Sequence, residues 1–92
     1  MYTPIDVKEA VKTAFAYLHD LLDSEGIADI MLEEVELSDD EREWHVTLGF
    51  HPRWTDTGPF DTLTGKRTRI YKTFTVDRRE GKVTAMRIRQ LQ

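Results

Sequence analysis

The chain has 92 residues, of which 39% are hydrophobic, a formal net charge of −4 and no cysteine. A chain of this length buries one modest core, so we predict a single domain over residues 1–92. The lack of cysteine excludes disulfides and thiolate metal sites. Charges interrupt the apolar pattern of residues 1–22 and no run reaches membrane-spanning length, so we expect neither a secretory signal nor membrane association, and a cytoplasmic location is favoured.

The charge is distributed unevenly along the chain. Residues 1–51 hold three basic and thirteen acidic residues, a net of −10, whereas residues 52–92 hold ten basic and four acidic residues, a net of +6. Acidic and basic strands that are neighbours in a sheet would offset one another. Acidic and basic strands on opposite edges would instead favour head-to-tail contacts or a charged partner. The sequence leaves both arrangements open.

Residues 3–23 are predicted to form an amphipathic helix. Thr3 is a suitable N-cap, Pro4 suits the first helical position, and Asp6 stands three residues after the cap, as in a capping box. Gly26 is the expected stop signal. Apolar residues recur at helical spacing at Val7, Ala10, Val11, Ala14, Phe15, Leu18, Leu21 and Leu22.

Two strands are expected next, at residues 29–37 and 43–50. The first is irregularly patterned, with Glu33 interrupting its apolar residues, and is predicted to lie at a sheet edge. Its two expected faces are Met31, Val35 and Leu37 against Ile30 and Leu32. The second strand predicts one buried and one solvated face, because Trp44, Val46, Leu48 and Phe50 alternate with polar residues and Gly49.

Residues 51–66 carry prolines, glycines and no periodicity, which predicts a loop much longer than the usual connection of about 4–6 residues. Trp54 and Phe60 lie within it. They either fold back over the core or act as exposed anchors for a partner, since aromatic residues dominate interface energetics.

Residues 69–89 predict a β-hairpin, with Asp77 and Gly81 supplying the turn chemistry. A loop over residues 78–81 sets a register that we expect to continue along both strands. The predicted pairs are Asp77 with Lys82, Val76 with Val83, Phe74 with Ala85 and Lys72 with Arg87.

This register creates a conflict, because Tyr71, Met86 and Ile88 then lie on the face opposite Val76 and Phe74. Side chains alternate strictly along a strand, so either a β-bulge near Lys72 or Met86 changes the face, or the sheet is apolar on both sides. We favour the bulge, and regard the alternative as a potential interface.

No catalytic, cofactor or metal constellation is recognisable. His45 and His51 are too far apart on one strand to share a metal ion, and the acidic cluster around Ser38 to Glu43 lacks the glycine of a calcium loop. A glycine-rich phosphate loop is missing. Basic residues near the C-terminus fall on different predicted faces, so we expect no nucleic-acid binding.

The order of a helix, a strand with Trp-x-Val and then a Tyr-x-x-Phe-x-Val-Asp-x-x-x-Gly-x-Val stretch resembles the PepSY-type module. That resemblance implies a helix on an antiparallel sheet, similar to cystatins in architecture, and the binding or restraint of peptidases. The cystatin Gln-x-Val-x-Gly loop is absent, so protease inhibition is not implied. The matching residues are Trp44, Val46, Tyr71, Phe74, Val76, Asp77, Gly81 and Val83.

We therefore expect an α+β domain in which one N-terminal helix packs on a four-stranded antiparallel meander, in the order α-β-β-β-β. The leading hypothesis for function is a non-enzymatic, protein-binding module that needs no cofactor, with a homodimer possible. An alternative is a small-molecule-binding domain or enzyme on the concave face of the sheet, using His51 or Tyr71. The candidate partner-binding residues are Trp54, Phe60, Tyr71, Met86 and Ile88.

Overall fold

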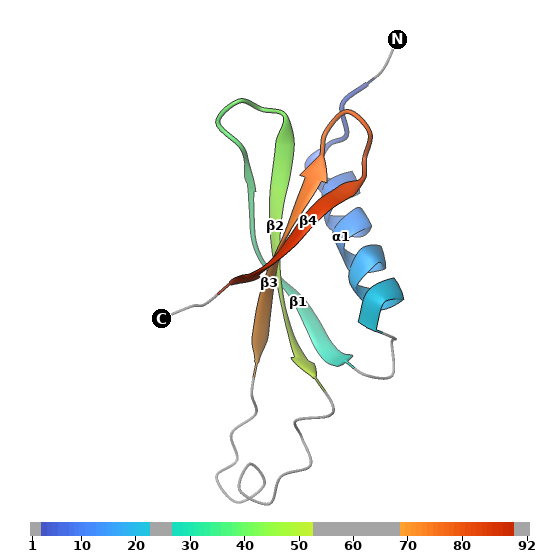
Figure 1. Cartoon of the computed structure of the whole chain (residues 1–92), viewed down its shortest axis with the longest axis vertical. Coiled ribbons are helices and arrows are strands. Elements are labelled where there is room, and N and C mark those ends of the chain that lie inside the picture. The colour runs from blue at the N-terminus through green and yellow to red at the C-terminus, as the bar shows by residue number, and fades with distance from the viewer. Residues whose placement is uncertain (1–2, 23–26, 53–68, 90–92) are drawn as a thin grey trace, which may run out of the picture.

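The computed structural model describes residues 3–22, 27–52 and 69–89. The described elements are α1 (Val7–Leu22), β1 (Ile27–Leu37), β2 (Glu43–Pro52), β3 (Ile70–Asp77) and β4 (Val83–Arg89). The strands form one antiparallel sheet in the order β1-β2-β3-β4, and α1 lies along one face of it (Figure 1). The predicted α+β class and α-β-β-β-β order are confirmed. The predicted start of the 51–66 loop is wrong, because His51 and Pro52 still belong to β2.

The helix begins one turn later than predicted. Asp6, not Thr3, is the N-cap: its carboxylate accepts a hydrogen bond from the backbone N–H of Glu9 at 2.9 Å, and its carbonyl accepts one from Ala10 at 3.0 Å. An aspartate cap satisfies a free N–H and also favours the positive end of the helix dipole. Pro4 therefore precedes the helix, while the expected stop at Gly26 lies outside the described residues. None of the described helices is long and apolar enough to span a bilayer.

The core lies between α1 and the helix-facing side of β2 and β3. Three residues of α1, spaced one turn apart, face β2 and β3. In both strands every second side chain points towards the helix, as predicted for β2. Burial of these apolar side chains stabilises the fold by about 25 cal/mol per Å² removed from water. The fully buried apolar residues are Ala10, Ala14, Leu18, Val46, Leu48, Phe50, Phe74 and Val76.

The hairpin contains the predicted β-bulge, placed nearer to the turn. Asp77 donates its N–H to the Lys82 carbonyl at 2.8 Å and Val76 faces Val83, both as expected. Thr84 is then an extra residue, because the next pair is Thr75 with Ala85. The expected pairs beyond this point are therefore wrong by one residue: Phe74 faces Met86 and Lys72 faces Ile88. This shift brings the apolar residues of β4 to the helix side of the sheet.

β1 is an edge strand, as predicted, and its register shifts twice, once between Ala28 and Met31 and once between Leu32 and Glu34. The expected division of its faces is wrong for three residues, because Ile30 and Leu32 lie with Val35 on the core side and Met31 does not. Leu32 lies opposite Leu48 on the helix side, whereas Met31 lies opposite Gly49 on the outer side. Because of the two register shifts, most of the apolar side chains of β1 point towards the core even though they do not alternate regularly in the sequence.

The outer side of the sheet, away from α1, is not the solvated face that the alternation of β2 predicts. Thr47 and Thr75 lie on this side and are only 2% and 6% exposed. The Thr47 and Thr73 hydroxyls are 2.9 Å apart and share a hydrogen bond. The strands twist strongly (Figure 1), and on this side the Glu34 and Arg89 side chains of the two edge strands lie 3.0 Å apart.

Candidate binding surface

β4 forms one edge of the described sheet, and its outward backbone groups can be assigned from the hydrogen-bond alternation. Asp77 donates its N–H to β4, so alternate β3 residues, including Thr75 and Thr73, also face β4. Their partners are Ala85 and Arg87. Consequently the N–H and C=O groups of the intervening residues, Met86 and Ile88, point away from the sheet.

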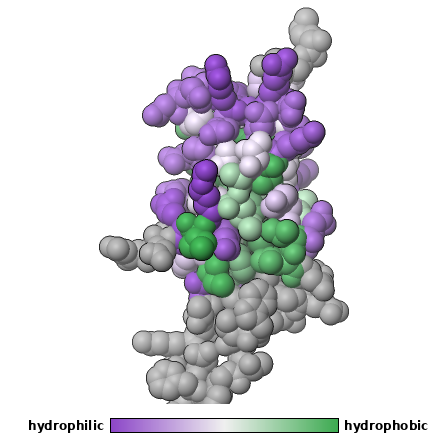
Figure 2. Space-filling view, viewed as in Figure 1, coloured by the Kyte–Doolittle hydropathy of each residue, from purple (hydrophilic) through white to green (hydrophobic). Residues whose placement is uncertain are grey.

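The side chains of Met86 and Ile88 lie on the helix side, but in different environments. Met86 faces Phe74 and packs against the core, and the Phe74 ring also makes an edge-to-face contact with Tyr17, with 6.0 Å between the centroids. Ile88 is 73% exposed, the most exposed of the large hydrophobic residues described. Figure 2 shows hydrophobic side chains gathered away from the hairpin turns, which are hydrophilic.

Tyr71 does not share a surface with Met86 and Ile88, so the structure does not assemble the apolar patch that the simple register suggested. Tyr71 faces Arg89 on β4 and Gly49 on β2, on the outer side of the sheet. A Cβ built on Gly49 would lie 2.6 Å from the Glu33 carboxylate and 3.0 Å from the Tyr71 ring. The outer side is therefore closely filled there, which removes space from the concave surface expected for a small molecule.

Ion pairs lie across this outer side, and one of them joins the two edges of the sheet. Arg89 of β4 lies 3.0 Å from the Glu34 carboxylate of β1, and Arg69, just before β3, lies 3.2 Å from the Glu33 carboxylate. The acidic strand β1 and the basic strand β4 are at opposite edges, yet their side chains meet. Of the two arrangements that the charge distribution left open, the structure therefore has the one with opposite edges, and the Glu34–Arg89 ion pair offsets part of the charge.

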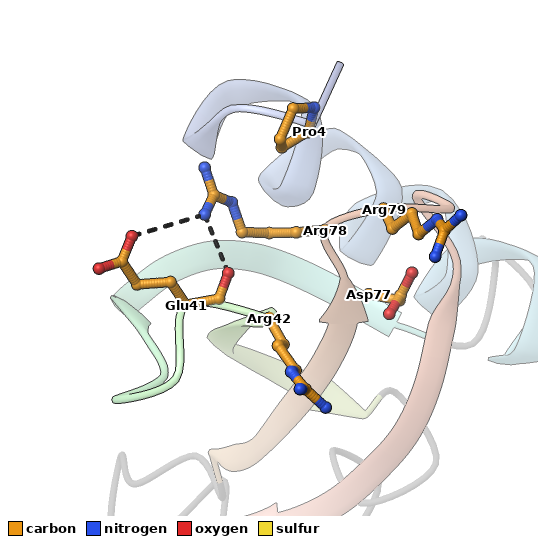
Figure 3. Close-up of a pocket in the computed structure, with 6 residues that line it drawn as sticks. All are labelled: Pro4, Glu41, Arg42, Asp77, Arg78 and Arg79. Atoms are coloured by element: carbon orange, nitrogen blue, oxygen red, sulfur yellow. Dashed lines mark hydrogen bonds and ion pairs between the residues drawn. The ribbon is translucent and has the colours of Figure 1, made fainter. Parts of the chain in front are cut away.

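At the turn end of the molecule, a hollow of about 470 Å³ lies between the start of α1 and the two hairpin turns. Figure 3 shows that its three arginines point in different directions, so they do not converge on one anion site. Its lining residues are Pro4, Glu41, Arg42, Asp77, Arg78 and Arg79.

Arg78 holds this junction together. Its guanidinium donates to the Glu41 carbonyl at 2.9 Å and lies 5.8 Å from the centre of the Trp44 ring. Its backbone carbonyl accepts a bond from Ile5, and its backbone N–H donates to Arg42. Trp44 also donates its indole N–H to the Ile5 carbonyl at 3.1 Å. Sequence reasoning missed this role, since Arg78 stands in a basic turn beside Arg79 and nothing local distinguishes them.

The remaining predicted residues give little support to a catalytic or metal site. His45 lies 3.3 Å from the Glu43 carboxylate, next to it on the same strand. The described part of the chain holds no group of three histidine, aspartate or glutamate side chains arranged for a metal ion. Trp54 and Phe60 lie outside the described residues, so their role as partner anchors stays a prediction.

Comparison with protein-family models, with curated proteins and with solved structures finds no match for this chain. The resemblance to the PepSY-type module therefore stays a prediction.

Proposed function

We propose that this chain is a non-enzymatic protein-binding module that accepts an extended segment of a partner along β4. The observation that carries the proposal is Ile88, an aliphatic residue that is 73% exposed on an edge strand. Proteins usually protect such edges, and an added strand satisfies the outward backbone groups while covering the apolar side chain. A cytoplasmic location, compatible with the lack of cysteine, belongs to the same proposal.

The structure changes which predicted residues the proposal uses. Ile88 supplies the exposed side chain, and Met86 supplies outward backbone groups while its side chain supports the core. Tyr71 lies on the other side of the sheet and has no part in this surface. The proposal is therefore narrower than the five-residue site expected from the sequence.

The test is selection of a random peptide library on the immobilised protein, followed by NMR mapping of the selected peptides. We expect extended peptides that shift the backbone amides of residues 84–89, and that bind the Ile88→Asp variant at least about tenfold more weakly, because an added charge faces apolar side chains. Leu21→Asp is the matched control, since Leu21 is 49% exposed but lies on α1. Peptides that instead map to α1 or to the outer side would refute the proposal.

A further inference from the structure

The two edges of this sheet are complementary to each other. β4 places Arg87 between Met86 and Ile88, and β1 places Glu36 between Val35 and Leu37. Both charged residues are exposed, and neither has an ion pair within the described residues. In each strand the charged residue lies on the outer side and its apolar neighbours lie on the helix side.

The outward backbone groups of β1 follow from the same alternation as those of β4. Glu43 of β2 accepts a hydrogen bond from the Ser38 N–H, so Glu43 and alternate β2 residues face β1. Glu36 is opposite His45 and bonds inward, which leaves the N–H and C=O groups of Val35 and Leu37 pointing away from the sheet. Each edge therefore offers outward backbone groups at its apolar residues.

We propose that β4 of one copy pairs antiparallel with β1 of a second copy, with Arg87 opposite Glu36. This proposal rests on the proposed function and names a second copy of the chain as the partner. The pairing sets Met86 opposite Leu37 and Ile88 opposite Val35. Two such residue pairs exchange about four backbone hydrogen bonds, and both helices then lie on the same side of the continued sheet.

Charge and register favour this arrangement over the alternatives. The same register also sets Arg89 of one copy opposite Glu34 of the other, next to the Glu34–Arg89 ion pair that each copy already has, whereas sliding β1 by two residues keeps only one opposite-charge pair between the copies. A symmetric dimer that pairs Met86 with Ile88 of another β4 would instead place Arg87 opposite Arg87. The head-to-tail pairing thus uses the acidic and basic edges that the fold separates.

The environment of β1 is suited to receive Ile88. An apolar hollow of about 320 Å³ lies between α1 and β1, on the helix side, and is lined by Val7, Val11 and Leu32 together with two lysines. The register shift between Leu32 and Glu34 ends before Val35, so the paired segment from Glu34 to Leu37 is regular. An added strand can therefore follow it without a bulge of its own.

Sedimentation equilibrium of the full chain tests the pairing. We expect wild-type protein to self-associate with increasing concentration, and the Arg87→Glu and Glu36→Lys variants each to associate at least about tenfold more weakly, because repulsion replaces attraction. An equimolar mixture of the two variants should regain association, since an acid again faces a base at every interface. Lys82→Glu and Glu80→Lys make the same charge changes at exposed turn positions and should leave association unchanged.

The register has its own readout, because the chain contains no cysteine. Residues 87 and 36 would form a non-hydrogen-bonded pair with Cα atoms about 4.5 Å apart, within the range that a disulfide spans. Mixing the Arg87→Cys and Glu36→Cys proteins under oxidation should therefore give a mixed dimer, whereas Lys82→Cys with Glu36→Cys should not.

Two results would overturn the inference. A wild-type chain that stays monomeric at millimolar concentration, while selected peptides still bind along β4, rejects the self-pairing and keeps the proposed function. Self-association that is unchanged in the Arg87→Glu variant rejects this pairing and assigns the contact to another surface.

Discussion

The two edge strands of the sheet differ in how they are protected. β1 has two register shifts, a left-handed backbone at Asp29 with φ of 56°, and three glutamates along its length. β4 has one shift, at Thr84 beside the turn, and is regular from Ala85 to Arg89. Bulges and charges hinder the addition of further strands, so most of β1 is protected while β4 is left open.

This difference shows that a sheet can have one edge protected against strand addition and the other edge open to it. Only the short segment from Glu34 to Leu37 of β1 is regular enough to pair, and it carries the charge opposite to that of β4. At such a surface, other registers and pairings of like charges are unfavourable, and this makes the pairing specific.

The largest expected effect is a difference in stability between substitutions of Met86 and Ile88, which stand two positions apart in β4. Met86→Ala should lower the free energy of unfolding by about 2 kcal/mol, because Met86 packs against the core. Ile88→Ala should change it by less than about 0.5 kcal/mol, because Ile88 is exposed. Urea denaturation measures both. Equal losses would mean that Ile88 is part of the core and would remove the contrast on which the binding surface depends.

A second effect concerns the irregular part of β1. Gly49→Ala should cost about 1 kcal/mol, because the new Cβ displaces the Glu33 carboxylate from its position near Arg69. In a Glu33→Ala background the same change should cost less, since the closest clash is gone and only the Tyr71 and Arg69 side chains, 3.0 and 3.1 Å from the new Cβ, have to shift slightly. Denaturation of the four proteins gives this coupling energy. A cost that is independent of Glu33 would show that the strand itself requires glycine here.

A smaller effect tests the link between the two edges. Glu34 and Arg89 are 49% and 40% exposed, so a double-mutant cycle with alanine should give a coupling of about 0.5 kcal/mol that decreases at high salt. The cycle of Lys8, an α1 residue, with Glu34 is a suitable comparison, because these two side chains form no ion pair in the described part of the chain. A coupling that salt does not reduce would contradict a screened surface ion pair.

The smallest effect lies in the turn that follows β1. The Ser38 hydroxyl, and then the Arg42 backbone N–H, donate hydrogen bonds to the Asp40 carboxylate and lower its pKa below the ordinary value. This contribution to stability is present above the unfolded-state pKa, about 3.9, and is lost as the pH falls through the lower folded-state value. Asp40→Asn should therefore be less stable than wild type at neutral pH, and the difference should shrink on acidification. An NMR titration of the carboxylate that shows no lowered pKa would contradict this.

Local patterns in the sequence were sufficient for the secondary structure but not for all boundaries. The alternation around Trp44 and the turn chemistry of Asp77 and Gly81 predicted two strands and a hairpin, because these signals depend on near neighbours. The helix start was misplaced, because Thr3 and Asp6 both suit an N-cap and the choice depends on the contact of Ile5 with Arg78.

The candidate surface was only partly predictable for a related reason. Ile88 was identified because an apolar residue on the wrong side of a hairpin signals either a bulge or an interface. The role of Arg78 was not, since its partners Glu41 and Trp44 are more than thirty positions away in the chain. Interactions between distant segments leave no periodic trace in the sequence.

The sequence by itself determined the α-β-β-β-β order and the turn of the last hairpin, because both follow from local chemistry and strict side-chain alternation. It favoured a bulge in that hairpin but left a sheet that is apolar on both sides as the alternative. Only the tertiary structure decided where the bulge lies and therefore that Met86 joins the core while Ile88 stays exposed. Register depends on all four strands together, because the favoured register places most of their apolar residues on the side that the helix covers. In the resulting register, β4 is an edge strand whose outward backbone groups are open to a further strand.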